Sequence, residues 1–371
     1  MKKILNLAAV IIILGTLMLT MTGCSDSSFI KALQNASDKA ESITATFDGI
    51  EIVSDTADLT LVPSDECKIE YTTHKRITYS TRVEDGVLKI KLEDNRRWFQ
   101  KVFSFGDGSK LTVYLPAGEY SSLTIKQSTG NIDIPADYKF GSADIDLSTG
   151  DTKFCASVVG DLKIHATTGD ITLENVSCGS LDTKVSTGKT SYANVVVTGD
   201  AQLNATTGDM FLNNVSFGNL SSVASTGDLT ATGLNGVGSL SIERSTAKVS
   251  LRDVNCGDMT VTVSTGKSSL TNVSCASFTT TGDTGDIDMT GLIASDKIDI
   301  TRDNGDVHFS GCDAAEINVT TNTGSVTGTL LTNKIFQVRT RTGKIDVPES
   351  WEGGKCKITT TTGSVKISIG Q

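Results

Sequence analysis

The sequence is poor in aromatic residues, in histidine and in recognisable catalytic motifs. Phe, Trp and Tyr make up 5% of the 371 residues, and the three histidines, His74, His165 and His308, are far apart. Neither Gly-x-Ser-x-Gly nor His-Glu-x-x-His occurs, which argues against the common serine hydrolases and zinc proteases. No Gly-x-Gly-x-x-Gly leads into a helix, so dinucleotide binding is disfavoured as well.

Basic residues and paired cysteine motifs are also scarce. The chain has 33 Lys and Arg against 43 Asp and Glu, and its eight cysteines include no Cys-x-x-Cys pair. An acidic surface argues against nucleic acid and against direct adsorption to anionic lipid. The cysteine spacing gives no indication of a zinc site.

What the chain has in abundance is one short turn, Ser/Thr-Thr-Gly, repeated every 19 or 20 residues. Alanine takes the place of glycine once, in Ser245-Thr246-Ala247. A period this strict is typical of a solenoid, in which one small unit stacks on copies of itself. The thirteen turn positions are Gly130, Gly150, Gly169, Gly188, Gly208, Gly227, Ala247, Gly266, Gly285, Gly305, Gly324, Gly343 and Gly363.

Within each repeat the apolar residues alternate with polar ones, which is the period of a β-strand and not of a helix. Ile171 and Leu173 stand two and four residues after their glycine, Val176 stands seven after it, and Leu162 and Ile164 stand seven and five before it. We therefore expect an all-β, right-handed parallel β-helix whose aliphatic side chains stack in ladders inside the coils. Thirteen coils spaced by about 4.8 Å would give a rod of roughly 60 Å.

The pattern divides the chain into four parts. Residues 1–23 read as an export signal, 24–41 as a polar tether, 42–126 as an irregular β cap with the first coils, and 127–371 as the regular solenoid. A cap is expected because the end of an aliphatic stack would otherwise be open to water. The aromatic cluster from Arg96 to Phe105 is either a plug of the capped end or a loop that contacts a ligand or a membrane.

The first 24 residues predict a lipid anchor. Lys2 and Lys3 precede an apolar run that is short for a membrane span, and Met21-Thr22-Gly23-Cys24 follows it. This end resembles the lipobox of bacterial lipoproteins, in which the cysteine is diacylated and becomes the new N-terminus. We therefore expect Cys24 to carry lipid, and more than one acyl chain would hold the protein stably on a membrane.

The lipobox, the strand ending in Leu115-Pro116 and the Thr-Gly-Asp-Ile type of repeat together resemble a family of bacterial β-strand-repeat proteins described as putative adhesins. The resemblance covers about residues 43–371. It implies a single-chain β-helix on the cell envelope, with a molecular function that the family leaves largely undefined. Its motifs are structural, so it carries over no catalytic residues.

Two places on the repeat suggest further chemistry. The residue after the glycine is most often Asp, with Lys interspersed, which we interpret as charge balancing along the stack. Two successive turns are instead rich in acid, because Asp283 and Asp286 should stack under Asp303 and Asp306. These carboxylates either bind a calcium ion or are balanced by Arg302 and solvent.

Cys256 and Cys275 occupy the same place in adjacent coils, nine residues after the turn. Stacking would bring them to a separation compatible with a disulfide, and the alternative is a reduced, half-buried pair.

These observations favour a non-enzymatic binding, adhesive or scaffold protein of the bacterial envelope. It would be attached to the membrane through Cys24, with an unknown protein or glycan as ligand and no cofactor other than the calcium considered above. Two alternatives remain open. Some β-helices cleave acidic polysaccharides, although such enzymes usually carry long loops around a cleft and these coils have no insertions. The other is an accessory protein of envelope-stress signalling.

Overall fold

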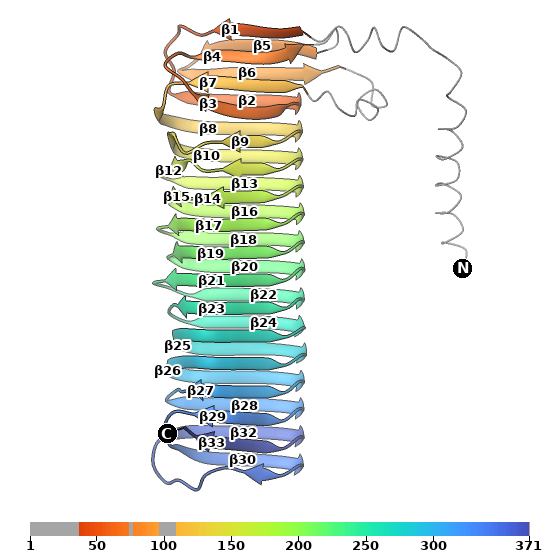
Figure 1. Cartoon of the computed structure of the whole chain (residues 1–371), viewed down its shortest axis with the longest axis vertical. Coiled ribbons are helices and arrows are strands. Elements are labelled where there is room, and N and C mark those ends of the chain that lie inside the picture. The colour runs from red at the N-terminus through yellow and green to blue at the C-terminus, as the bar shows by residue number, and fades with distance from the viewer. Residues whose placement is uncertain (1–36, 74–76, 96–108, 371) are drawn as a thin grey trace, which may run out of the picture.

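The computed structural model describes residues 37–73, 77–95 and 109–370. They form a long rod of stacked strands (Figure 1), and one hydrophobic core runs through it from the first coils to the last. The expected all-β solenoid with an irregular β cap is confirmed. The expected inward positions are also confirmed, since Ile171, Leu173, Val176, Leu162 and Ile164 are all buried.

Each coil contributes one strand to each of two long faces. From the N-terminal end, the first face consists of β6 (Val87–Asp94), β2 (Gly49–Thr56), β8 (Gly118–Thr129), β10 (Tyr138–Thr149), β13 (Asp161–Thr168), β16 (Ser180–Thr187), β18 (Asp200–Thr207), β20 (Asn219–Thr226), β22 (Leu240–Thr246), β24 (Met259–Thr265), the second parts of β25 (Ser268–Thr284) and β26 (Ile287–Asn304), β28 (Glu316–Thr323), β32 (Gly354–Thr362) and β30 (Lys334–Thr342).

The second face has the same order and is likewise parallel throughout. It consists of β7 (Lys110–Leu115), β3 (Asp58–Pro63), β9 (Ile132–Ile134), β11 (Thr152–Phe154), β14 (Ile171–Glu174), β17 (Thr190–Val197), β19 (Met210–Phe217), β21 (Leu229–Gly236), β23 (Val249–Asn255), the first parts of β25 and β26, β27 (Val307–Cys312), β29 (Val326–Leu330), β33 (Val365–Ile369) and β31 (Ile345–Asp346). The short strands β12 (Ser157–Val158) and β15 (Ser177–Cys178) lie in the connection that returns to the first face.

The spatial order of the coils departs from the sequence order at both ends of the rod. At the N-terminal end, β2 lies between β6 and β8, so the first coil is held between two later ones. At the C-terminal end, β32 lies between β28 and β30, so the last coil is inserted before the coil that precedes it in sequence. Figure 1 shows β30 as the outermost strand.

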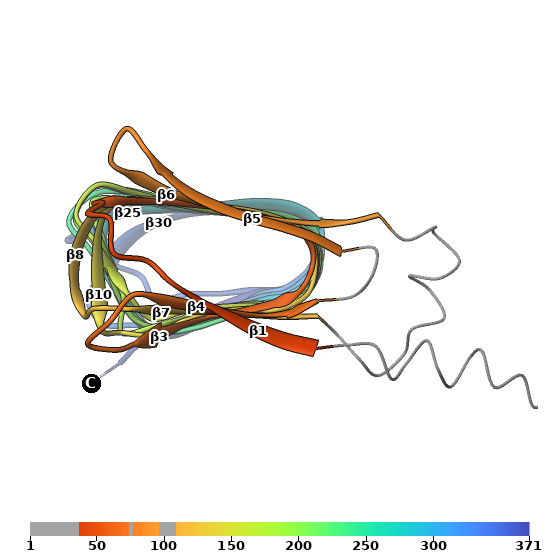
Figure 2. The ribbon, with the colours of Figure 1, turned by 90° about the horizontal axis from the view of Figure 1, so that it is seen from above.

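Antiparallel strands close the N-terminal end. β5 (Ile77–Glu84) pairs with β6, β4 (Lys68–Thr73) pairs with β7, and β1 (Ser37–Ser42) pairs with β4. Looking along the rod, Figure 2 shows the coils superposed as a flattened ring with β5 along one long side and β1 and β4 along the other. The rings of Tyr71 and Tyr79 stack with their centroids 3.7 Å apart, which brings β4 and β5 into contact.

The repeated glycine serves two purposes at the turn. Gly169 has φ of 135°, a backbone conformation that residues other than glycine rarely adopt. A Cβ atom there would also lie 1.8 Å from the carbonyl oxygen of Gly150 in the preceding coil. The turns therefore stack backbone against backbone, and positive φ is only half of the reason for glycine at this position.

A second ladder, of asparagine, marks the opposite corner and was not anticipated from the sequence. Asn175, Asn194 and Asn214 stand six residues after their glycines and have φ values of 54–57°. The amide of Asn194 donates to Asn175 Oδ1 at 3.0 Å, and that of Asn214 donates to Asn194 Oδ1 at 3.2 Å. These bonds connect neighbouring coils from outside the core. The signal in the sequence is the recurrence of Asn, Asp or Gly at this position.

Candidate functional site

The aspartates that follow the turn glycines bind the backbone of the next coil. Asp151 Oδ1 accepts the N–H of Asp170 at 2.8 Å, and Asp170 Oδ1 accepts the N–H of Lys189 at 2.8 Å. The charge-balancing interpretation therefore missed a structural role, which is to satisfy a turn N–H that has no other acceptor within its own coil. Where this position is a lysine, as at Lys189, there is no carboxylate to accept the next N–H, so the series of hydrogen bonds between coils stops.

The four acidic residues considered for calcium belong to this ladder or border it. Asp283, Asp286, Asp303 and Asp306 are all exposed. Asp286 Oδ1 accepts the N–H of Asp306 at 2.9 Å, so one oxygen of that carboxylate is already occupied. Within the described residues there is no group of three or more His, Cys, Asp or Glu side chains arranged to hold a metal ion. Calcium binding here therefore stays a prediction.

Arg302, the residue expected to balance these carboxylates together with solvent, is buried, with 1% of its surface exposed. Its guanidinium donates to the carbonyl of Val263 at 2.8 Å and to Thr280 Oγ1 at 3.1 Å. Burial lowers the pKa of Arg302, and the nearby Asp283 carboxylate opposes that shift. The side chain fits because residue 282 is glycine: a Cβ there would lie 1.8 Å from Arg302 Nη1.

Arg244 repeats this arrangement three coils earlier. It is 1% exposed and donates to the carbonyl and the hydroxyl of Ser222, both at 2.8 Å. It also donates to the carbonyl of Glu243 at 2.9 Å and, more weakly, to Met210 Sδ at 3.7 Å. No carboxylate in the described part of the chain forms an ion pair with it, so the rod contains a buried cation held by neutral acceptors alone. Burial lowers the pKa of Arg244 to about 10.

The two cysteines considered for a disulfide are both free and both buried, more deeply than the half-buried pair that was the alternative. They lie in consecutive coils, directly after the paired residues Asn255 and Ser274. Burial raises the pKa of Cys256 to about 11 and that of Cys275 to about 12. Because only a thiolate attacks readily, these thiols are slow to react near neutral pH.

Three sequence predictions lie outside the described residues: the export signal over 1–23, the lipid on Cys24, and the aromatic cluster from Arg96 to Phe105. In residues 37–73, 77–95 and 109–370 we find no apolar helix with the length needed for a membrane crossing.

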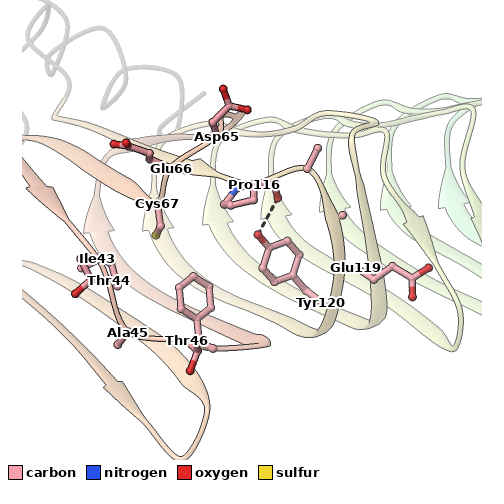
Figure 3. Close-up of a pocket in the computed structure, with 13 residues that line it drawn as sticks. Ile43, Thr44, Ala45, Thr46, Asp65, Glu66, Cys67, Pro116, Glu119 and Tyr120 are labelled. Carbon is pink, nitrogen blue, oxygen red and sulfur yellow. Dashed lines mark hydrogen bonds between the residues drawn. The ribbon is translucent and has the colours of Figure 1, made fainter.

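A groove of about 670 Å³ opens beside the cap, between the segment from Ile43 to Phe47 and the start of β8 (Figure 3). The ring of Tyr120 stacks on that of Phe47 with centroids 6.2 Å apart, and its hydroxyl donates to the carbonyl of Pro116 at 2.8 Å. Asp65 and Glu66 also line the groove. Burial raises the pKa of the Cys67 thiol to about 11, which makes it a poor nucleophile. The groove can therefore seat an apolar or aromatic group beside carboxylates.

A second hollow, of about 620 Å³, lies on the outward side of the first face. His165 on β13 lines it and lies between two carboxylates, with Nδ1 3.6 Å from Asp146 and Nε2 3.4 Å from Asp182. Lys126 and Lys184 line the same hollow. Sequence reasoning missed this cluster because it treated the widely spaced histidines one at a time. The residues on either side of His165 come from neighbouring coils.

Comparison with known proteins matches nearly the whole described rod to one family. Residues 47–235 and 232–371 match the sequence profile of Toastrack DUF4097. No curated protein matches the chain.

Several solved structures are similar to the chain at low identity. A "putative cell adhesion protein" from Clostridium sporogenes is 8% identical, with 90% of this chain and 100% of that chain covered and a TM-score of 0.22. A "putative adhesin" from Bacteroides fragilis is 11% identical, with 90% and 97% covered and a TM-score of 0.25. A "putative adhesin" from Parabacteroides distasonis is 13% identical, with the same coverage and a TM-score of 0.24.

Proposed function

Since the chain belongs to the Toastrack DUF4097 family, we propose that it is a non-enzymatic binding or scaffold rod of the bacterial cell envelope, attached to a membrane through a lipid on Cys24. The family profile spans both the cap and the solenoid. A rod of this kind acts by presenting its surface to other molecules.

The observation that carries this proposal is the regular array of exposed side chains on the long faces. Asp146, His165 and Lys184 follow one another in register on β10, β13 and β16, and Asp144, Lys163 and Asp182 form the next row. Consecutive residues in such a row are separated by one strand spacing, about 4.8 Å. A polymer with its own regular repeat, such as a glycan, can contact several coils at once. Several individually weak contacts along one polymer chain then give a higher overall affinity than any single contact.

The position of the cap supports attachment at the N-terminal end. The described chain enters the rod through β1, which pairs with β4 at that end. Cys24 precedes Ser37 by 13 residues, a stretch that can span at most about 45 Å. A lipid on Cys24 would therefore keep the cap near the membrane, with the C-terminal coils farther away.

The proposal is tested with a lipid-free full-length Cys24→Ala variant, immobilised and exposed to the host's envelope and extracellular glycans. Retention of a glycan or protein, reduced by Lys126→Glu with Lys184→Glu and unaffected by Arg252→Glu on the other face, supports a binding rod. Failure to retain any envelope component would contradict it. Release of new reducing ends from a polysaccharide would instead favour the polysaccharide-cleaving alternative, and His165→Ala would show whether the cluster is responsible.

A further inference from the structure

The C-terminal end of the rod is open, in contrast to the N-terminal end. β30 pairs only with β32, and β31 pairs only with β33, among the strands that the structure describes. Each therefore has a row of backbone N–H and C=O groups on its outer edge without a strand partner. An edge of this kind is a template on which another extended chain can pair.

The inward side chains of this outermost coil are incompletely covered. Ile345 is 50% exposed, whereas Val307 and Val365, at the same place in inner coils, are fully buried. Phe336 and Val338 on β30 are only partly buried against the core. Trp351, in the loop between β31 and β32, is 91% exposed. The end of the hydrophobic core is thus accessible from beyond β30.

The outward side chains of the same coils are basic, although the whole chain is acidic. Arg339 and Arg341 are exposed on β30, and Lys355 and Lys357 are exposed on the adjacent β32. None of these four forms an ion pair with any described residue, whereas Lys334 at the start of β30 is buried and pairs with Asp313 at 2.5 Å. Residues 334–370 contain seven basic residues (Lys334, Arg339, Arg341, Lys344, Lys355, Lys357, Lys366) against three acidic ones (Asp346, Glu349, Glu352).

These charges decide which chain can occupy the edge. A second copy pairing through its own β30 would bring two basic strips together, and like charges across a strand pair are destabilising. The opposite applies to a strand whose outward residues are acidic, because carboxylates accept charge-assisted hydrogen bonds from arginine. The inward positions of such a strand must be apolar to cover Phe336 and Val338.

We propose that the outer edge of β30 is a docking site for an extended segment of another protein in which apolar and acidic residues alternate. The segment adds one strand to the rod by β-augmentation. Its backbone bonds to the free edge of β30, its apolar residues cover the end of the core, and its carboxylates lie beside Arg339 and Arg341. This site is independent of the glycan surface proposed above, so either can fail without the other.

The test uses the full-length chain in detergent and a fluorescent nine-residue peptide of alternating Val and Glu, matched to the length of β30. Fluorescence anisotropy measures its binding. We expect Arg339→Glu with Arg341→Glu to weaken binding about tenfold, since two partly exposed ion pairs are lost. Arg252→Glu, an exposed charge reversal on β23, is the matched control and should bind as wild type does.

Two control peptides separate the contribution of charge from that of backbone pairing. A peptide with Lys in place of Glu should not bind, and neither should a Val/Glu peptide whose alternate amides are N-methylated, because it cannot pair along an edge. Equal binding of the N-methylated peptide, or equal binding to wild type and to the double variant, would overturn the proposal. The proposal would also be overturned if the wild-type protein did not bind the peptide but self-associated in sedimentation experiments. Binding of wild type to anionic vesicles and not to the peptide would overturn it as well.

Discussion

Replacing Arg244 with Met and Ser222 with Ala together is expected to stabilise the middle of the rod, although the change removes a buried, hydrogen-bonded pair of side chains. The reason is the absence of a carboxylate beside the guanidinium. Its oxygen partners are the carbonyl and hydroxyl of Ser222 and the carbonyl of Glu243, all within 2.9 Å, and Nη2 also lies 3.7 Å from Met210 Sδ. Its Nε atom has no partner among the described residues. A charge buried in this way lowers the stability of the fold unless its contacts repay the lost hydration.

The size of the effect follows from the pKa. Burial lowers the pKa of Arg244 to about 10. The ordinary pKa is near 12.5, so the shift corresponds to a free-energy cost of roughly 3 kcal/mol for keeping the guanidinium charged in the folded protein. Removing the guanidinium recovers that amount but leaves acceptors in the core without a donor, at about 1 kcal/mol or more for each. Because Ser222→Ala removes one of those acceptors, we expect the double variant to gain about 1–2 kcal/mol.

Hydrogen exchange measured by mass spectrometry suits this rod, because long repeat arrays need not unfold in one step. Peptides from β20 and β22 should exchange about tenfold more slowly in the double variant, because a local stabilisation of about 1.4 kcal/mol lowers the population of the open state tenfold. Peptides from β13 and β16, two to four coils away, provide the internal reference. Ser222→Ala alone should speed exchange in the same peptides, because it leaves the guanidinium with fewer acceptors.

The pH dependence gives an independent check. A base whose pKa is lowered by folding is penalised while it stays charged, so the penalty is complete below about pH 10 and is relieved as the pH rises through that value. The advantage of the double variant should therefore be full near pH 8 and shrink above about pH 10. Faster exchange in the double variant than in wild type near pH 8, or an advantage that does not change with pH, would refute this account of Arg244.

Three further outcomes can be checked directly. A fatty-acid analogue fed to cells should label wild type and not Cys24→Ala, and equal labelling of both would exclude the lipid anchor. If the acidic turns bind calcium, the ion should raise the melting temperature of wild type, and Asp283→Asn with Asp303→Asn should remove that rise; no rise in wild type would leave a plain solvated turn. Gly169→Ala, with φ of 135° and a Cβ 1.8 Å from a carbonyl oxygen, should lower the melting temperature far more than Gly118→Ala, where φ is 152° and nothing lies within 4 Å. Similar losses would show that backbone strain of about 1–3 kcal/mol, and not close stacking, is the main cost.

The aliphatic ladders could be predicted because each position is apolar in coil after coil. The ladder three residues before the glycine could not, since it contains Leu147, Ala166 and Val185 but also Arg244 and Arg302. A prediction from side-chain hydrophobicity places arginine on the surface, so Arg244 and Arg302 would not be expected in the core. The available signal was indirect: Arg244 follows Ser222, and Arg302 follows Thr280, by the same 22 residues.

The exchange of coils at the two ends was also invisible in the sequence. Gly324, Gly343 and Gly363 keep the regular spacing of 19 and 20 residues, yet the coil of Gly363 lies between the other two. Every coil offers the same alternating pattern, so any coil can stack on any other. The sequence pattern alone therefore does not set the order of the coils at the ends of the rod.

The exchanged coil also determines how the rod responds to tension. In a solenoid stacked in sequence order, a pull on the chain after the last strand peels away one coil at a time, breaking one ladder with each step. Here a pull on the chain after β33 meets β32 clamped between β28 and β30, and both ladders must be sheared together. The outermost coil cannot be peeled first, because force reaches it only through the clamped one. An unfoldase or a hydrodynamic load acting from this side must therefore overcome a larger first barrier than any later one.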